Sequence, residues 1–149
     1  MSSLELTQAE ADRFLAMEKV RVNDDEWNFP QVGEKIMVPL LSKDRKESFG
    51  LDVSRKRIDL SKLTYQNRVR TNIILARLDL GARPHRNPDG AEVGSPHIHL
   101  YREGYADKWA FEVPSDLFGD LDDHYRALFD FMDYCKIVEQ PIIEKGLFA

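Results

Sequence analysis

The sequence predicts an α+β fold, in which one domain of residues 1–149 holds a twisted, mostly antiparallel sheet with an N-terminal and a C-terminal helix packed on it. Two patterns predict this class. Apolar residues recur at helical spacing near both ends of the chain, and they alternate with polar residues, between turn signals, through the middle. A length of 149 residues suits one ordinary domain with one core.

The N-terminal helix is expected over residues 6–20. Thr7 and Glu10 have the spacing of a capping box, in which each side chain accepts a hydrogen bond from the other residue's free backbone N–H. Ala11 and Phe14 then begin an apolar stripe. We therefore expect a short amphipathic helix whose apolar side faces the core.

Six strands are expected from alternating or β-branched segments, at residues 35–41, 49–53, 58–60, 65–80, 96–102 and 107–113. Pro39 limits the first of them to an edge or a bulge, because proline cannot donate to a ladder. The segment 65–80 is the longest. Its second half is apolar on both faces, which predicts a position in the centre of the sheet, while its polar first half is expected to project past the core. A helix is the competing interpretation, and the β-branched residues of this segment favour a strand.

The C-terminal helix is expected to run from an N-cap at Asp120 to about Cys135. Its apolar residues fall at spacings of three and four, which predicts one buried stripe: Leu121, Tyr125, Leu128, Met132 and Cys135. We interpret Cys135, on that stripe, as a small core residue rather than a nucleophile. The apolar tail, residues 137–149, is expected to pack on the domain or on a second copy in a homodimer.

Composition narrows the class of protein. The single cysteine excludes an internal disulfide, and no apolar run approaches the roughly 20 residues that span a bilayer, so no membrane association and a cytoplasmic location are expected. Residues 55–102 carry ten Lys/Arg and four Asp/Glu, a local charge of +6, which leaves −11 on the rest of a chain of net charge −5. Either the acidic flanks neutralise this basic middle, or a positive face meets phosphates or an acidic partner. The overall negative charge disfavours non-specific binding to long nucleic acids.

The candidate site lies in residues 83–109, which hold three of the four histidines. In a strand, residues two apart point the same way, so His97, His99 and Tyr101 are expected on one outward face, with Ile98 and Leu100 toward the core. The turn signal Asn-Pro-Asp-Gly at residues 87–90 is expected to fold His85 back toward His97.

This arrangement suggests metal-independent cleavage of RNA, of the kind that a small toxin performs. Imidazoles titrate near neutral pH, so His97 and His99 would act as acid and base in either order, with His85 beside them. Tyr101 or Arg102 would hold the phosphate, and Arg86 and Lys108 add positive charge nearby. The mechanism requires neither a metal nor a cofactor.

Three other interpretations remain open. The histidines are satisfied polar groups on an outer face, or they are incidental in a non-catalytic protein that binds and inhibits a host macromolecule. In the third interpretation His85, His97 and His99 bind zinc or iron. The string His97-x-His99-x-x-x-Glu103 resembles the first half of the cupin metal motif, whose second half is absent from the sequence.

Two motifs carry a wider resemblance, His-Arg-Asn-Pro-Asp-Gly at residues 85–90 and Pro-His-x-His-x-Tyr-Arg-Glu-Gly at residues 96–104. The chain resembles, over most of its length, a family of small uncharacterised bacterial proteins often associated with phages and mobile elements. The resemblance implies no established activity. It suggests mobile-element biology, in which small toxins and anti-defence inhibitors are common.

Overall fold

The structure is a computed structural model that describes residues 5–57 and 62–146. Its helices are α1 (Gln8–Ala16) and α2 (His124–Tyr134). Its strands are β1 (Lys19–Arg21), β2 (Glu26–Asn28), β3 (Lys35–Ser42), β4 (Ser48–Arg55), β5 (Leu63–Val69), β6 (Ile73–Leu80), β7 (His85–Arg86), β8 (Glu92–Val93), β9 (His97–Arg102), β10 (Ala106–Glu112), β11 (Ile137–Glu139) and β12 (Ile142–Glu144).

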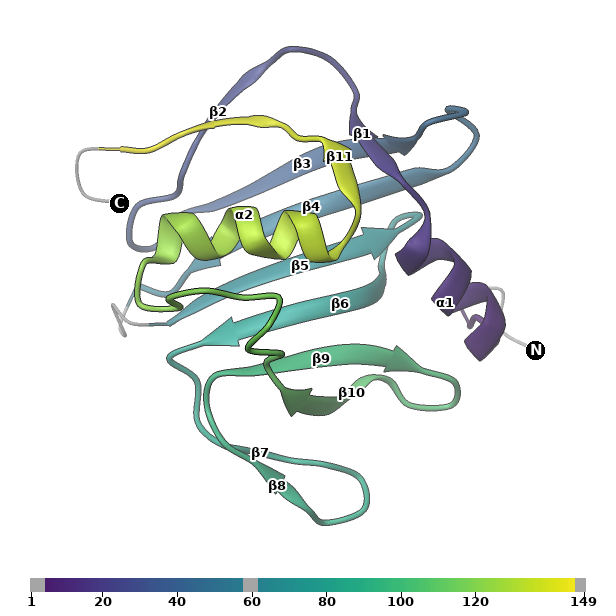
Figure 1. Ribbon diagram of the computed structural model, residues 1–149, viewed down its shortest axis with the longest axis vertical. Helices are drawn as coiled ribbons and strands as arrows, with labels where there is room; N and C mark the ends of the chain where they lie inside the picture. Colours follow the sequence, from purple (N-terminus) through teal and green to yellow (C-terminus); the bar gives the residue numbers. More distant parts are fainter. Residues whose placement is uncertain (1–4, 58–61, 147–149) are drawn as a thin grey trace.

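Eight of these strands form the main sheet, in the order β10–β9–β6–β5–β4–β3–β1–β11 (Figure 1). Neighbours are antiparallel except for β1 and β11, which run parallel. The predicted class, an α+β domain with a mostly antiparallel sheet and two helices, is therefore confirmed for the described residues. The expected short strand at residues 58–60 lies outside them.

The N-terminal helix has the expected capping box, but it begins at Gln8, after the expected start at residue 6, and it ends early. Thr7 Oγ1 accepts a hydrogen bond from the Glu10 N–H at 3.1 Å, and Glu10 Oε1 accepts one from the Thr7 N–H at 3.0 Å, so the capping box is present. The expected end at residue 20 is wrong. The backbone becomes extended at Met17, and the next residues join the sheet as β1, where Lys19 pairs with Ser42.

The segment 65–80, expected as one strand, is a hairpin of β5 and β6. Arg70 adopts a positive φ of 57° in the tight turn between them. The expectation that the first half projects past the core is also wrong, because Tyr65 and Val69 are fully buried in β5. The expected central position holds for β6, which lies between β5 and β9.

The C-terminal helix begins later than expected. Its N-cap is Asp123, whose carboxylate accepts a hydrogen bond from the Arg126 N–H, whereas Asp120 accepts one from the Asp122 N–H in the preceding turn. Cys135 is buried at the C-cap, and its predicted place in the core is confirmed. The tail pairs within the chain, since β11 adds to β1 and β12 to β2.

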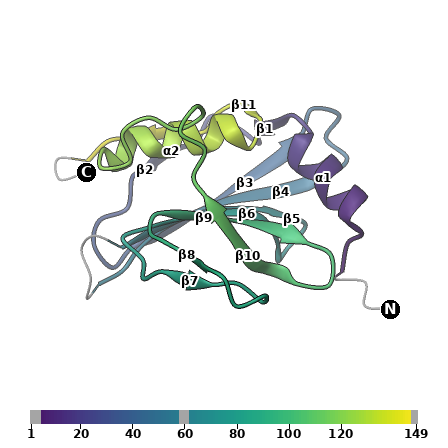
Figure 2. The same ribbon diagram turned by 60° about the horizontal axis from the view of Figure 1, so that its bottom comes forward.

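The two faces of the sheet differ. Figure 2 shows α2 on one side and the β7–β8 hairpin on the other. On the α2 side, Tyr65 packs against Phe131 with ring centroids 6.2 Å apart, and its hydroxyl donates to the His124 carbonyl at 2.7 Å. On the opposite face, strand register places polar residues in a row across β4, β5, β6 and β9: Asp52, Gln66, Arg77 and His99. The apolar core is therefore on the helix side and a polar layer on the other.

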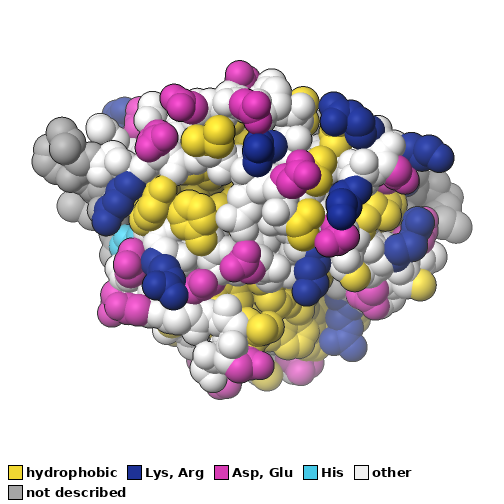
Figure 3. Space-filling model, turned by 45° about the horizontal axis from the view of Figure 1, so that its top comes forward, with side chains coloured by type: hydrophobic (Ala, Val, Ile, Leu, Met, Phe, Trp, Pro, Cys, Tyr) yellow, Lys and Arg dark blue, Asp and Glu magenta, His cyan; other side chains and the backbone are white. Residues whose placement is uncertain are grey.

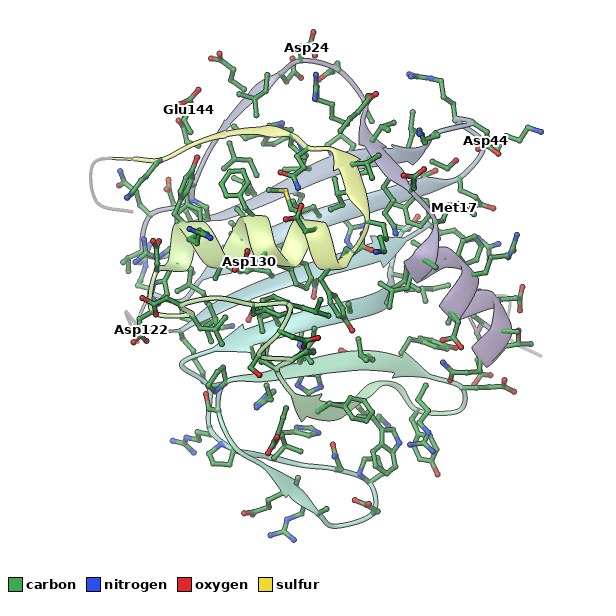
Figure 4. The ribbon with its side chains drawn as sticks, viewed as in Figure 1. Met17, Asp24, Asp44, Asp122, Asp130 and Glu144 are labelled. Atoms are coloured by element: carbon green, nitrogen blue, oxygen red, sulfur yellow. The ribbon has the colours of Figure 1, made fainter. Side chains whose placement is uncertain are left out.

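Charges on the rest of the surface are mixed. Figure 3, which brings the top of Figure 1 forward, shows acidic and basic side chains interspersed. Asp24 and Glu144, from the two acidic flanks, lie at the end of the molecule opposite the β7–β8 hairpin (Figure 4). Neither side chain is therefore placed to neutralise the histidine region. Among the described residues, no helix has both the length and the apolar character needed to cross a bilayer.

Candidate functional site

Pairing of β6 with β9 creates the site. Asp79 lies opposite His97 and Arg77 lies opposite His99 in this antiparallel register, so the four side chains share the face that α2 does not cover. The turn at residues 87–90, with Gly90 at φ 89°, returns the chain as the β7–β8 hairpin. The His85 ring then lies 4.7 Å from the His99 ring and 5.8 Å from the His97 ring, centroid to centroid. The predicted return of His85 toward His97 is confirmed.

Each buried imidazole uses one nitrogen on a backbone carbonyl. His99 Nδ1 lies 2.8 Å from the Asp107 carbonyl oxygen, and His97 Nδ1 lies 3.2 Å from that of Gly94. A carbonyl oxygen only accepts, so Nδ1 carries the proton in both rings. The Nε2 atoms then point at one carboxylate oxygen, Asp79 Oδ2, at 3.2 Å from His99 and 3.4 Å from His97.

A guanidinium group completes the cluster. Arg77 lies 3.2 Å from Asp79 Oδ1 and 2.6 Å from Asp107 Oδ2, and one of its terminal nitrogens lies 3.1 Å from His99 Nε2. Arg77 is thus the donor for His99. The Nε2 of His97, in contrast, faces an oxygen that can only accept.

Burial and charge oppose each other in the pKa values here. Burial would raise the pKa of Asp79, but the neighbouring His99 ring, the Arg77 charge and the His97 ring outweigh it and lower that pKa. Burial lowers the pKa of His97, against the opposing effects of the Gly94 carbonyl and the Asp79 charge. Near neutral pH the cluster therefore presents an ionised carboxylate to a largely uncharged His97.

The expected outward histidine face is wrong. His97 is 2% exposed and His99 is 1% exposed. The His85 ring and Arg77 cover them, and β10 pairs along the outer edge of β9. His85 itself is half-buried, and its Nε2 lies 2.7 Å from the Lys108 carbonyl oxygen.

Of the four residues expected to bind phosphate, three have side chains engaged elsewhere. Tyr101 is buried, and its hydroxyl donates to the Leu6 carbonyl and accepts from the Leu6 N–H, both at 2.8 Å. Arg86 pairs with Glu92 in the β7–β8 hairpin at 3.0 Å, and the Arg102 guanidinium lies 4.5 Å from the centre of the Trp109 ring. The Lys108 contact with His85 is through its backbone. Their phosphate-binding roles stay predictions.

Glu103, the third residue of the cupin-like string, also lies elsewhere, because its carboxylate accepts a hydrogen bond from the Gln8 N–H at 2.8 Å. Asp79 takes the acidic position in the cluster, and sequence reasoning did not identify it or Arg77 as site residues. A signal existed: both are charged and share one face of an otherwise apolar strand.

Asp79, His97 and His99 form a donor set that could hold a metal ion, since one ligand atom from each lies within 4.8 Å of the others. Bonds of about 2.0–2.1 Å around a tetrahedral ion separate neighbouring ligand atoms by about 3.3 Å. The two nitrogen–oxygen distances, 3.2 and 3.4 Å, match that spacing. Backbone carbonyls that hold Nδ1 are also typical outer partners of metal-binding histidines.

A model of a family of unknown function, DUF6978, matches residues 6–137. The chain belongs to this family. No curated protein and no solved structure matches it significantly. The DUF6978 match supports the predicted resemblance to an uncharacterised family and includes the whole histidine cluster, while the phage and mobile-element association stays a prediction.

Proposed function

We propose that this protein binds a divalent transition-metal ion, with zinc the first candidate, through Asp79 Oδ2 and the Nε2 atoms of His97 and His99. The single observation that supports this most is the convergence of the Nε2 atoms of His99 and His97 on one carboxylate oxygen at 3.2 and 3.4 Å. In the tautomer with the proton on Nδ1, the lone pair of each Nε2 atom faces the negatively charged carboxylate and is repelled by it. A cation bound between these three atoms would attract all of them. Three protein ligands leave a fourth position open, as in zinc sites that perform chemistry.

Arg77 is the competitor of this ion. Its guanidinium lies within 3.3 Å of both Asp79 oxygens and 3.1 Å from His99 Nε2, so it already places a positive charge against two of the three ligands. An entering ion displaces that contact, and Arg77 keeps its other partner, Asp107, at 2.6 Å. We therefore expect Arg77→Gln to bind zinc more tightly than wild type, by roughly tenfold.

The test is a titration of protein purified without an affinity tag and stripped by a chelator. Zinc should bind with a stoichiometry of one by calorimetry, and Co²⁺ should give the visible spectrum of a tetrahedral site. His99→Gln and Asp79→Asn should each weaken binding by at least about a hundredfold, since loss of an outer partner alone typically costs 10–100-fold. His124→Ala is the matched control, because His124 lies on α2 outside the cluster.

Wild-type protein that binds neither ion would reject the proposal. So would binding that His124→Ala weakens as much as His99→Gln does. Circular dichroism of each variant separates loss of the site from loss of the fold.

Metal-free cleavage of RNA by His97 and His99 stays a prediction, and so does inhibition of a host macromolecule. The burial of both imidazoles weighs against the first, because a general acid and base must reach the ribose and the phosphate. The DUF6978 match bears on neither function.

A further inference from the structure

A cleft of about 380 Å³ opens beside Asp79, on the face of the sheet that carries the histidines. Three of its lining residues, Ser54 of β4, Thr64 of β5 and Asp79 of β6, lie directly opposite one another in the strand register. Lys56 and Lys62 also line it. Because Asp79 belongs to both the cleft and the metal cluster, the two sites are contiguous.

The lining is basic and rich in hydrogen-bond donors. Lys56, Lys62 and Arg77 are its positive residues, and Asp79 is the one acidic residue among the described residues of the lining. That carboxylate is already paired with Arg77 and faces the two imidazoles. The hydroxyl of Thr64 lies 3.4 Å from Asp79 Oδ1, beside the cleft. With Arg77 and Asp79 paired, Lys56 and Lys62 leave the lining with a net positive charge, and ammonium groups bind phosphate oxygens.

We infer that this cleft binds the phosphate group of a small phosphate monoester, next to the ion that the proposed function places at Asp79. Its volume lies in the range of small-molecule sites, which is about 300–1,000 Å³. A small dianion experiences mainly the local positive charge, whereas a long polyanion is repelled by the net charge of −5. Arg86 and Arg102, the basic residues expected at the histidines, are held by Glu92 and Trp109.

The inference rests on the proposed function for one consequence: the zinc-loaded protein should bind the monoester more tightly than the metal-free protein. Phenyl phosphate is the probe, titrated by calorimetry into both forms. Lys56→Gln/Lys62→Gln should weaken its binding by roughly tenfold or more, because charged hydrogen bonds to phosphate are lost. The matched control is Lys43→Gln/Lys46→Gln, which removes the same charge from the turn after β3 and should change binding less than about twofold.

The outcomes separate the two ideas. The cleft assignment is wrong if both double variants weaken the binding of phenyl phosphate equally. It is also wrong if phenyl phosphate binds neither form of the wild-type protein. In either case zinc titration still tests the metal site alone. Lys56- and Lys62-dependent binding without any zinc binding supports the cleft and rejects the metal proposal. A short RNA with hydroxyl ends is the last probe. If it binds through Lys56 and Lys62 while phenyl phosphate does not bind, the assignment of the cleft to phosphate monoesters is wrong.

Discussion

The ammonium of Lys19 and the imidazoles of His97 and His99 are both buried, yet their polar atoms are used differently. Lys19 is 0% exposed, and its Nζ donates to three carbonyl oxygens, those of Leu15, Met17 and Cys135, at 3.0, 2.9 and 2.8 Å. An ammonium has three protons, so Lys19 has no remaining donor.

The imidazoles satisfy one nitrogen each on the backbone and point the other at Asp79. Lys19 joins the ends of both helices to β1, where the carbonyls at the helix C-termini favour a positive charge. The comparison separates a buried charge that completes the fold from a buried cluster in which two Nε2 atoms converge on one carboxylate oxygen. Four predictions test this difference.

Lys19→Met should have the largest effect on stability. It leaves three carbonyls without a donor, one of them buried and two part-buried, and we expect the free energy of unfolding to fall by about 3 kcal/mol. Urea denaturation measures this, and zinc affinity should not change. Lys46→Met, at an exposed position, should stay within about 0.5 kcal/mol of wild type. A loss below about 1 kcal/mol for Lys19→Met would show that water or neighbouring groups satisfy those carbonyls.

Asp79→Asn should cost less stability, about 2 kcal/mol, while removing zinc binding. The amide leaves Arg77 with Asp107 alone, but Asp79 and Arg77 are partly exposed, so the loss is smaller than for a fully buried pair. Urea denaturation in chelator measures the stability, and zinc calorimetry measures the binding. Intact zinc binding would mean that the carboxylate serves the fold and not an ion.

Gly50→Ala should cost about 1–2 kcal/mol. A Cβ at Gly50 would meet a terminal nitrogen of Arg68, a guanidinium that lies 2.6 and 2.8 Å from the two Asp52 oxygens. This pair shares the histidine face of the sheet, and both Asp52 oxygens already accept hydrogen bonds from Arg68 and Gln66. Zinc affinity should therefore not change. Gly146→Ala, where a Cβ meets nothing within 4 Å, is the control for both measurements.

The pH dependence of Lys19 should give the smallest effect. Burial lowers its pKa to about 8 from 10.5, so the unfolded chain binds more protons than the folded chain above pH 8. Stability relative to Lys19→Met should therefore rise by about 1 kcal/mol between pH 7 and pH 9. Because both proteins keep Cys135, its own titration cancels in this difference. A flat difference would mean that the three carbonyls hold the proton on Lys19 throughout.

Local signals were enough for the elements that hold the site. The Thr7–Glu10 capping box, the turn at residues 87–90 and the strand expected at residues 96–102 each depend on neighbours within a few residues, and all three are present in the structure. The hairpin at Arg70 was missed because its turn has neither glycine nor proline. A residue other than glycine at positive φ is uncommon, and the sequence shows no sign of it.

The composition of the cluster depended on contacts that no local pattern encodes. Alternation places Arg77 and Asp79 on one face of a strand, but only the pairing of β6 with β9 sets them against His99 and His97. Burial of the histidines was missed for the same reason, because the His85 ring that covers them comes from a separate hairpin. A single sequence therefore predicts which side chains could bind an ion or transfer a proton. The order of the strands in the sheet decides which of these side chains come into contact.

Strand β1 lies between β3 and β11, and β11 belongs to the segment that follows α2. During synthesis on the ribosome, one edge of β1 therefore stays unpaired until residues 137–139 emerge. An exposed strand edge recruits other chains, so a product shortened before this point should aggregate rather than remain a slightly weaker monomer. Emergence of residues 137–139 thus covers this edge of β1, at the margin of the sheet far from the histidines.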